Sequence, residues 1–127
     1  PLGRAKTGII DANDVGEIAG RIASKIPEKS SIRELSGESL LDFHDVAKLM
    51  SKALGKQIHY NEQSHADFHS HLAKTIPSPW HVDAVSLLSK EIANGALEAT
   101  TNDAKDILGR APTDVQEFVS HHRLAFI

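Results

Sequence analysis

The chain has 127 residues, of which 40% are hydrophobic and 24% charged, with a formal net charge of −3. This composition is typical of one globular domain, which we place over residues 1–127, and it excludes a disordered or two-domain chain. The absence of cysteine excludes disulfides, thiol nucleophiles and zinc–thiolate sites, and 14 basic against 17 acidic residues give no cationic field for nucleic acid.

The terminus and the apolar stretches bear on where the protein resides. The chain begins at Pro1 with neither an initiator Met nor a signal-like segment, which is typical of an excised or processed piece. No apolar stretch approaches the roughly 20 residues of a membrane-spanning helix. We therefore expect a cytoplasmic protein that neither crosses a membrane nor binds nucleic acid.

The first third of the chain predicts a strand, a helix and a second strand. Residues 7–11 are a short apolar run that ends at a carboxylate, which favours a buried strand. Apolar positions at helical spacing predict a helix with one buried stripe over residues 15–26, capped by Asn13 or Asp14 and ended by Pro27. Residues 32–35 are a candidate second strand.

The middle of the chain predicts three helices and another strand. A helix over residues 43–54 is expected between the N-cap Asp42 and the C-terminal Gly55, followed by a strand at residues 57–60. Ser64 predicts the start of a helix that ends before Pro77, and Ser78 followed by proline predicts the next helix, which ends near residue 95. Its inner stripe is expected at positions 80, 84, 85, 88 and 92.

The last third predicts a short helix over residues 103–108, ended by Gly109, and a terminal helix whose apolar stripe reaches Phe126. Thr113 and Gln116 form a capping-box pattern at the start of that helix. The sum is a predominantly helical chain, with five to six helices and two to three short strands. Because strands this short need neighbours, we expect the strands that pair with them to lie elsewhere.

Three segments of the sequence together point to one protein family. A hydrophobic run that ends in Asp-x-x-Asp-Val occupies residues 8–15. Residues 35–60 have the pattern of a strand, a glycine turn, a helix and a return strand, and residues 109–119 contain a Gly-Arg-x-Pro turn before the last helix. In this order the segments resemble the NmrA-like atypical short-chain dehydrogenases/reductases, and the resemblance covers the whole chain.

The resemblance implies an α/β family fragment, namely the substrate-side C-terminal lobe, which lacks the N-terminal Rossmann half. Family members with both halves are NAD(P)-dependent oxidoreductases or redox-sensing regulators. A phosphate-binding G-x-G-x-x-G loop is absent from this sequence, since Gly16 and Gly20 lie inside the first predicted helix. We expect no cofactor on the isolated chain, with NAD(P) implied for a full-length family member.

The resemblance also implies where a small-molecule substrate is enclosed. The loops after Tyr60 and from Pro77 to Trp80 would surround it. Trp80 either stacks on a planar ligand or belongs to the core, since it also begins an apolar stripe. Tyr60 either lines the pocket or packs its ring as an ordinary strand residue.

The histidines are the other candidates for chemistry. His65 and His69 share a helix face at the i, i+4 spacing of a metal pair, yet Ala66 stands where a zincin needs Glu, and no third ligand can be named. We therefore predict no metal site and treat the pair as packed, solvated or engaged in proton transfer. With His44 and Tyr60 they are the candidate acid–base groups.

Two functions from different classes follow, with a third possibility. The first is the substrate- or partner-binding lobe of an NAD(P)H-dependent oxidoreductase or redox-sensing regulator, inactive in redox chemistry alone. The alternative is a stand-alone, cofactor-independent cyclase, isomerase or lyase that uses His44, His65, His69 and Tyr60. A pure interaction module, without a small-molecule pocket, is the third. Short unpaired strands and apolar helix faces predict a dimer or pairing with the missing half.

Overall fold

A computed structural model describes residues 1–25 and 29–126. In these residues the chain forms six α-helices and a short 3-10 helix, none of them long and apolar enough to cross a membrane. The elements, in chain order, are α1 (Ala12–Ser24), α2 (Phe43–Leu54), α3 (His65–Thr75), α4 (Pro79–Ala93), α5 (Asp103–Leu108), α6 (Val115–His121) and η1 (Arg123–Ala125).

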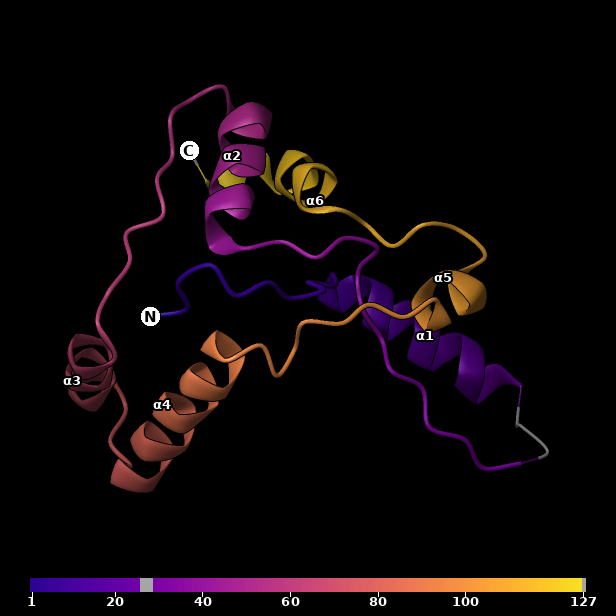
Figure 1. The fold of residues 1–127 in the computed structure, drawn as a ribbon. Helices are drawn as coiled ribbons and strands as arrows, with labels where there is room; N and C mark the ends of the chain where they lie inside the picture. Colours follow the sequence, from indigo (N-terminus) through magenta and orange to yellow (C-terminus); the bar gives the residue numbers. More distant parts are fainter. Residues whose placement is uncertain (26–28, 127) are drawn as a thin grey trace.

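The helices pack in pairs that lie in different parts of the molecule (Figure 1). α1 contacts α5, α2 contacts α6, and α3 contacts α4, while long connecting segments run between the pairs. The buried cluster of the first pair is small and consists of Ile18, Ala104 and Leu108, with Ile10, Leu35 and Ile107 packed against it. The molecule is thus an open arrangement of helix pairs rather than helices around one large core.

Several predicted helix ends are confirmed. The side chains of Asp42, Ser64 and Ser78 accept hydrogen bonds from the first-turn amides of α2, α3 and α4, and Pro79 is the first residue of α4. Gly55 and Gly109 follow α2 and α5 with φ of 69° and 67°, the left-handed conformation that favours glycine.

Other predicted caps are wrong. Asp11, not Asn13 or Asp14, caps α1 by accepting from the Asn13 amide. Asp114, one residue after the predicted Thr113 cap, caps α6 by accepting from the Glu117 amide, so the helix starts at Val115. α6 ends at His121 rather than continuing to residue 126, and the predicted end of α1 at Pro27 lies outside the described residues. In both corrected cases the cap is an aspartate within three residues of the predicted one.

The predicted strand at residues 7–11 is replaced by an isolated antiparallel bridge between Thr7 and Leu41 in the described chain. The Gly37 amide donates to the Gly8 carbonyl at 3.1 Å, so these segments pass backbone to backbone. A side chain at Gly37 would collide with the carbonyl oxygen of Ile9, which explains the glycine of this turn. The segment around Gly8 and the segment around Gly37 are thus held together by single backbone contacts and do not form a sheet.

The predicted strands at residues 32–35 and 57–60 are also wrong, because side chains satisfy their backbone groups. Glu34 donates its amide to Asp103 at 3.0 Å, and the Thr101 hydroxyl donates to the Glu34 carbonyl. Ile58 donates its amide to the Ser51 hydroxyl of α2 at 2.9 Å. Short segments without neighbouring strands are held instead by hydroxyls and a carboxylate.

The apolar stripe predicted for the first helix is largely exposed, and the stripe predicted for the fourth helix is half-buried at positions 84, 85 and 92 and exposed at positions 80 and 88. On α1 only Ile18 of that stripe is buried, while Val15 and Ile22 are 37% and 40% exposed. On α4 the buried residues are Val82, Ser86 and Ser89 rather than the predicted stripe. Trp80 is 77% exposed, so its assignment to the core is wrong.

Candidate functional site

An apolar cavity of about 330 Å³ lies beside Tyr60. The chain start, the first residue of α2, the segment after α2, and helices α3 and α4 all contribute to it. Its lining residues are Pro1, Leu2, Phe43, Tyr60, Phe68, Val85, Leu88, Ser89 and Ile92. A cavity of this size lined by aromatic and aliphatic side chains suits a small apolar ligand.

Tyr60 and His44 are the two predicted site residues that the structure brings together. The His44 ring meets the Tyr60 ring edge-on, with ring centroids 5.1 Å apart. Phe43 lies on the same tyrosine at 5.6 Å, so three rings from α2 and the following segment pack together. The Tyr60 hydroxyl accepts from the Leu2 amide at 3.4 Å, which leaves its own proton free to be donated. Tyr60 lines the cavity, and His44 contacts the Tyr60 ring without lining the cavity itself.

His69 and Pro77 lie at a different place, a smaller cavity of about 140 Å³ between α3 and α4. The His69 Nε2 atom is 2.9 Å from an Asp83 carboxylate oxygen, which links the two helices. Pro77 lines this smaller cavity and not the one beside Tyr60. Tyr60 and Pro77, which were both predicted to enclose the substrate, therefore line two different cavities.

His65 and Trp80 line neither the cavity beside Tyr60 nor the smaller cavity between α3 and α4. His65 is half-buried at the start of α3, and its Nδ1 atom is buried without a hydrogen-bond partner. Trp80 lies at the start of α4, mostly in solvent, with its ring 6.4 Å from that of His81. Across the described residues, no group of three or more His, Asp or Glu side chains is arranged to hold a metal ion.

The apolar walls of the Tyr60 cavity were missed as site residues, although the sequence carries a signal for them. Val85, Leu88, Ser89 and Ile92 follow the i, i+3, i+4, i+7 spacing of one helix face. Periodicity identifies such a face but does not distinguish a face that packs on a core from one that lines a cavity. Phe68 on α3 completes the wall by tertiary packing alone.

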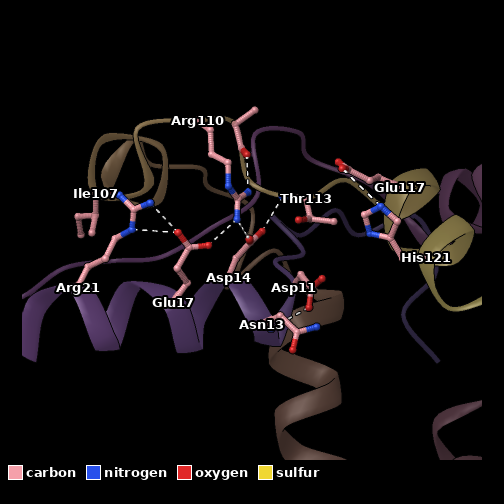
Figure 2. Close-up of polar contacts among 11 residues, drawn as sticks. Asp11, Asn13, Asp14, Glu17, Arg21, Ile107, Arg110, Thr113, Glu117 and His121 are labelled. Carbon is pink, nitrogen blue, oxygen red and sulfur yellow. Dashed lines mark hydrogen bonds and ion pairs between the residues drawn. The ribbon is translucent and has the colours of Figure 1, made fainter.

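A second polar centre joins the beginning of α1 to the segment after α5 (Figure 2). The buried Asp14 carboxylate accepts from the Arg110 guanidinium at 2.7 Å and from the Thr113 amide at 2.6 Å. Glu17, one turn later, accepts from Arg110 and from Arg21. The Asp-x-x-Asp-Val and Gly-Arg-x-Pro segments, both named in the family resemblance, thus bind each other across 96 residues of sequence.

The ionisation of this centre follows from its contacts. Burial alone would raise the pKa of Asp14, but hydrogen bonds from the Thr113 amide and the Arg110 side chain outweigh it and lower the pKa. Hydrogen bonds from Arg110 and Arg21 lower the pKa of Glu17. The pKa of Arg110 is raised by its bonds to Asp14 and Glu17. All these groups are ionised at neutral pH, which makes the centre a structural clamp rather than a proton carrier.

Three helix N-termini of the described chain do not fit the pyrophosphate of a nicotinamide cofactor. Such a group binds at a helix N-terminus that follows a glycine-rich turn. Here the N-caps of α1, α2 and α6 are Asp11, Asp42 and Asp114, whose carboxylates already accept the first-turn amides. An anion placed there would displace the cap and face a negative charge.

Comparison with known proteins identifies relatives over nearly the whole chain. No family model matches the sequence. The chain is 26% identical over 122 residues to the uncharacterized oxidoreductase YesF of Bacillus subtilis, covering 94% of this chain and 42% of that protein. It is 26% identical over 108 residues to quinone oxidoreductase 2 of Escherichia coli, covering 85% of this chain and 38% of that protein. The chain thus spans about two fifths of the length of these relatives and matches their C-terminal portions.

Solved structures agree with the sequence relatives. The NADPH-dependent quinone oxidoreductase of E. coli superposes with a TM-score of 0.80 at 24% identity, over 96% of this chain and 44% of that one. A nucleoside-diphosphate-sugar epimerase from Staphylococcus aureus superposes with a TM-score of 0.77 at 26% identity, over 94% of this chain and 42% of that one. The resemblance to the C-terminal half of NmrA-like NAD(P)-dependent proteins is thereby confirmed, and the predicted fold class is correct in its helices but not in its strands.

Proposed function

We propose that this chain is the substrate-side lobe of an NAD(P)H-dependent oxidoreductase and acts only together with a polypeptide that binds the cofactor. One observation carries the proposal: nearly all of this chain matches less than half of several oxidoreductases, one of which is described as NADPH-dependent. The aspartate caps, which occupy the N-termini of α1, α2 and α6, support a lobe that needs a second half to bind the cofactor.

The proposed substrate site is the cavity beside Tyr60. Its walls are apolar, and Tyr60, which lines it, is contacted on its ring by His44. An uncharged, flat or compact organic molecule is the chemical class that such a cavity accepts at least cost, because no charge is desolvated. In this arrangement Tyr60 orients a carbonyl-like oxygen of the substrate by donating its proton, and His44 supports the ring from its edge.

The test begins with the protein in its cell of origin. We expect a species much heavier than 13.8 kDa, the mass of this chain, that binds NADPH when titrated by fluorescence. A native species of 13.8 kDa that ignores NADPH would exclude the proposed role.

A matched pair of variants then tests the cavity in the NADPH-binding species. Val85→Trp fills the cavity, whereas Leu87→Trp adds the same group to an exposed position of the same helix. We expect the first to lower kcat/KM for reduction of a benzoquinone at least about tenfold, which is the effect of roughly 1.4 kcal/mol, and the second to leave it unchanged. Equal effects of the two variants would remove the cavity from the proposal.

The contact between His44 and Tyr60 favours one second candidate, a redox-neutral cyclase, isomerase or lyase. Tyr60 lines an apolar cavity and contacts His44, a second group able to carry protons, which is an arrangement that general acid–base chemistry can use. This candidate requires a native 13.8 kDa species whose turnover needs no NADPH. Its proton transfer would be lost in Tyr60→Phe and kept in His69→Ala, because His69 lies at the other cavity.

A further inference from the structure

We propose that the cavity beside Tyr60 selects a substrate whose ring carries a straight hydrocarbon chain, and that this chain lies along α4. The inference rests on the proposed function, which puts the substrate in this cavity, and it names the part of the substrate that the cavity recognises. It is carried by the kinds of side chain that line the cavity and by the partners of its polar atoms.

The cavity presents a hydrocarbon lining to a ligand. Seven of its nine lining residues have side chains without a polar atom, namely Pro1, Leu2, Phe43, Phe68, Val85, Leu88 and Ile92. The Ser89 hydroxyl already donates to the Ser86 carbonyl at 2.8 Å. The Tyr60 hydroxyl accepts from the Leu2 amide, and its own proton is the one that the proposed function gives to a substrate oxygen. A ligand with further polar groups would lose hydrogen bonds to water here without replacing them.

The lining residues of α4 with aliphatic side chains form a row. We define the aliphatic row as Val85, Leu88 and Ile92, which recur at i, i+3 and i+7 on one face of the helix. With a rise of about 1.5 Å per residue, the row is about 10 Å long. A single six-membered ring covers only part of that length, whereas a ring that bears a chain of several carbon atoms covers all of it.

The aromatic lining residues provide a place for the ring of the substrate. The Phe43 and Tyr60 rings lie with their centroids 5.6 Å apart, and Phe68 of α3 lines the same cavity. A planar ring gains from contact with such side chains in offset or edge-on geometry. The proposal therefore places the ring of the substrate, with its oxygen at the Tyr60 hydroxyl, among the aromatic residues and the chain over the aliphatic row.

The aliphatic row is partly open to water. Leu88 lines the cavity and is nevertheless 55% exposed, while Val85 and Ile92 are half-buried. A hydrocarbon chain over Leu88 removes this side chain from water, which stabilises the complex in proportion to the apolar area buried. Because the chain start, α2, α3 and α4 (Figure 1) all contribute to a cavity of about 330 Å³, the space suits a small molecule rather than a flat protein surface.

Calorimetric titration of the NADPH-binding species with phenols of increasing chain length tests this inference. The compounds para-methyl-, para-propyl- and para-pentylphenol share one ring and one oxygen and are not reduced by NADPH, so only the chain varies. The isomer para-tert-pentylphenol has the same composition as the pentyl compound in a compact, branched form.

A matched pair of variants locates the chain. Leu88→Asn places an amide in the aliphatic row, and Leu87→Asn makes the same substitution at the next residue, which is 60% exposed and is not among the lining residues. Both positions are more than half exposed, so we expect both variants to fold. If Leu88→Asn does not fold, Leu88→Gln replaces it.

We expect the dissociation constant to fall about two- to fourfold for each methylene added between methyl and pentyl, and the branched isomer to bind at least about threefold more weakly than the straight one. Leu88→Asn should reduce the gain from methyl to pentyl at least about threefold, and Leu87→Asn should leave it unchanged.

Equal dissociation constants along the series, equal binding of the two isomers or equal effects of the two variants, in a protein that binds NADPH, would overturn the inference and leave the proposed function standing. A native species of 13.8 kDa that ignores NADPH but shows the full dependence on chain length would overturn the proposed function and leave the hydrocarbon site in place.

Discussion

At the scale of single residues, the decisive side chain is Asp14. It is 2% exposed and bonds both to Arg110 and to the Thr113 amide. A carboxylate taken out of water is stable only when such donors replace its hydration. The sequence pattern alone makes Asp14 look like a helix cap, whereas the structure uses it to hold the segment after α5 against α1.

Asp14→Asn is expected to destabilise the isolated chain by about 2 kcal/mol, within the range for lost hydrogen bonds to a charged group. The amide removes the charge that Arg110 and Thr113 face while keeping the size of the side chain. Urea unfolding at pH 7, followed by circular dichroism, measures the effect. Glu91→Gln, which neutralises an exposed carboxylate of α4, is the control and should leave the unfolding midpoint in place. Equal midpoints for the two variants would contradict the role given to Asp14.

The lowered pKa of Asp14 also predicts a pH dependence. A carboxyl group whose pKa is lower in the folded state than in the unfolded chain stabilises the fold above its ordinary pKa, about 3.9 for Asp. That contribution is lost as the pH falls below this value and through the folded-state pKa. The difference in unfolding free energy between wild type and Asp14→Asn should therefore be constant from pH 7 to 5 and shrink below pH 4. A difference that stayed constant down to pH 3 would show that the charge of Asp14 contributes nothing.

At the scale of elements, Ser51 shows how a helix side chain substitutes for a strand neighbour. Its hydroxyl donates to the Ala47 carbonyl at 2.7 Å and accepts from the Ile58 amide at 2.9 Å. This bond fixes the segment that leads to Tyr60 and so determines one wall of the cavity. The segment over residues 57–60 is therefore held against α2 by a side-chain hydrogen bond and not by pairing with another strand.

Ser51→Ala is expected to cost about 1 kcal/mol, because the Ile58 amide loses its partner at a half-buried place. Ser120→Ala is the matched control. It removes a hydroxyl that donates only to the carbonyl four residues earlier, so it should be neutral or slightly stabilising. Thermal unfolding compares the two variants, and a shift of the Tyr60 ring resonances in the NMR spectrum should accompany the first only. If both variants melt together, Ser51 does not fix this segment.

The same elements show what a sequence can predict. Helices were predictable where a local cap and a local stop agree, as at Asp42 and Gly55 around α2, because the residues that determine both ends lie within a few positions. Residues 32–35 and 57–60 were mistaken for strands, since extended apolar character is local but strand pairing is not. Tyr60 and His44 were named as site residues, but their contact depends on tertiary packing. No pattern in the sequence indicated that Tyr60 and Pro77 line different cavities.

At the scale of the whole molecule, the helices are held by contacts within separate pairs rather than by one core. The cluster of Ile18, Ala104 and Leu108 joins only α1 and α5. Elsewhere large apolar side chains face water, with Leu87 60% exposed and Leu124 86% exposed. A chain with this much unburied surface has little hydrophobic stabilisation of its own, because that stabilisation scales with the apolar area removed from water.

This open shape predicts a measurable size in solution. A compact domain of 127 residues has a radius of gyration of about 14 Å. Because the helix pairs lie apart (Figure 1), the isolated monomer should exceed that value in small-angle X-ray scattering extrapolated to low concentration. Light scattering on the same samples fixes the mass, so that a larger radius caused by dimers is recognised. A monomer with a radius near 14 Å would mean that the pairs close on one another in solution.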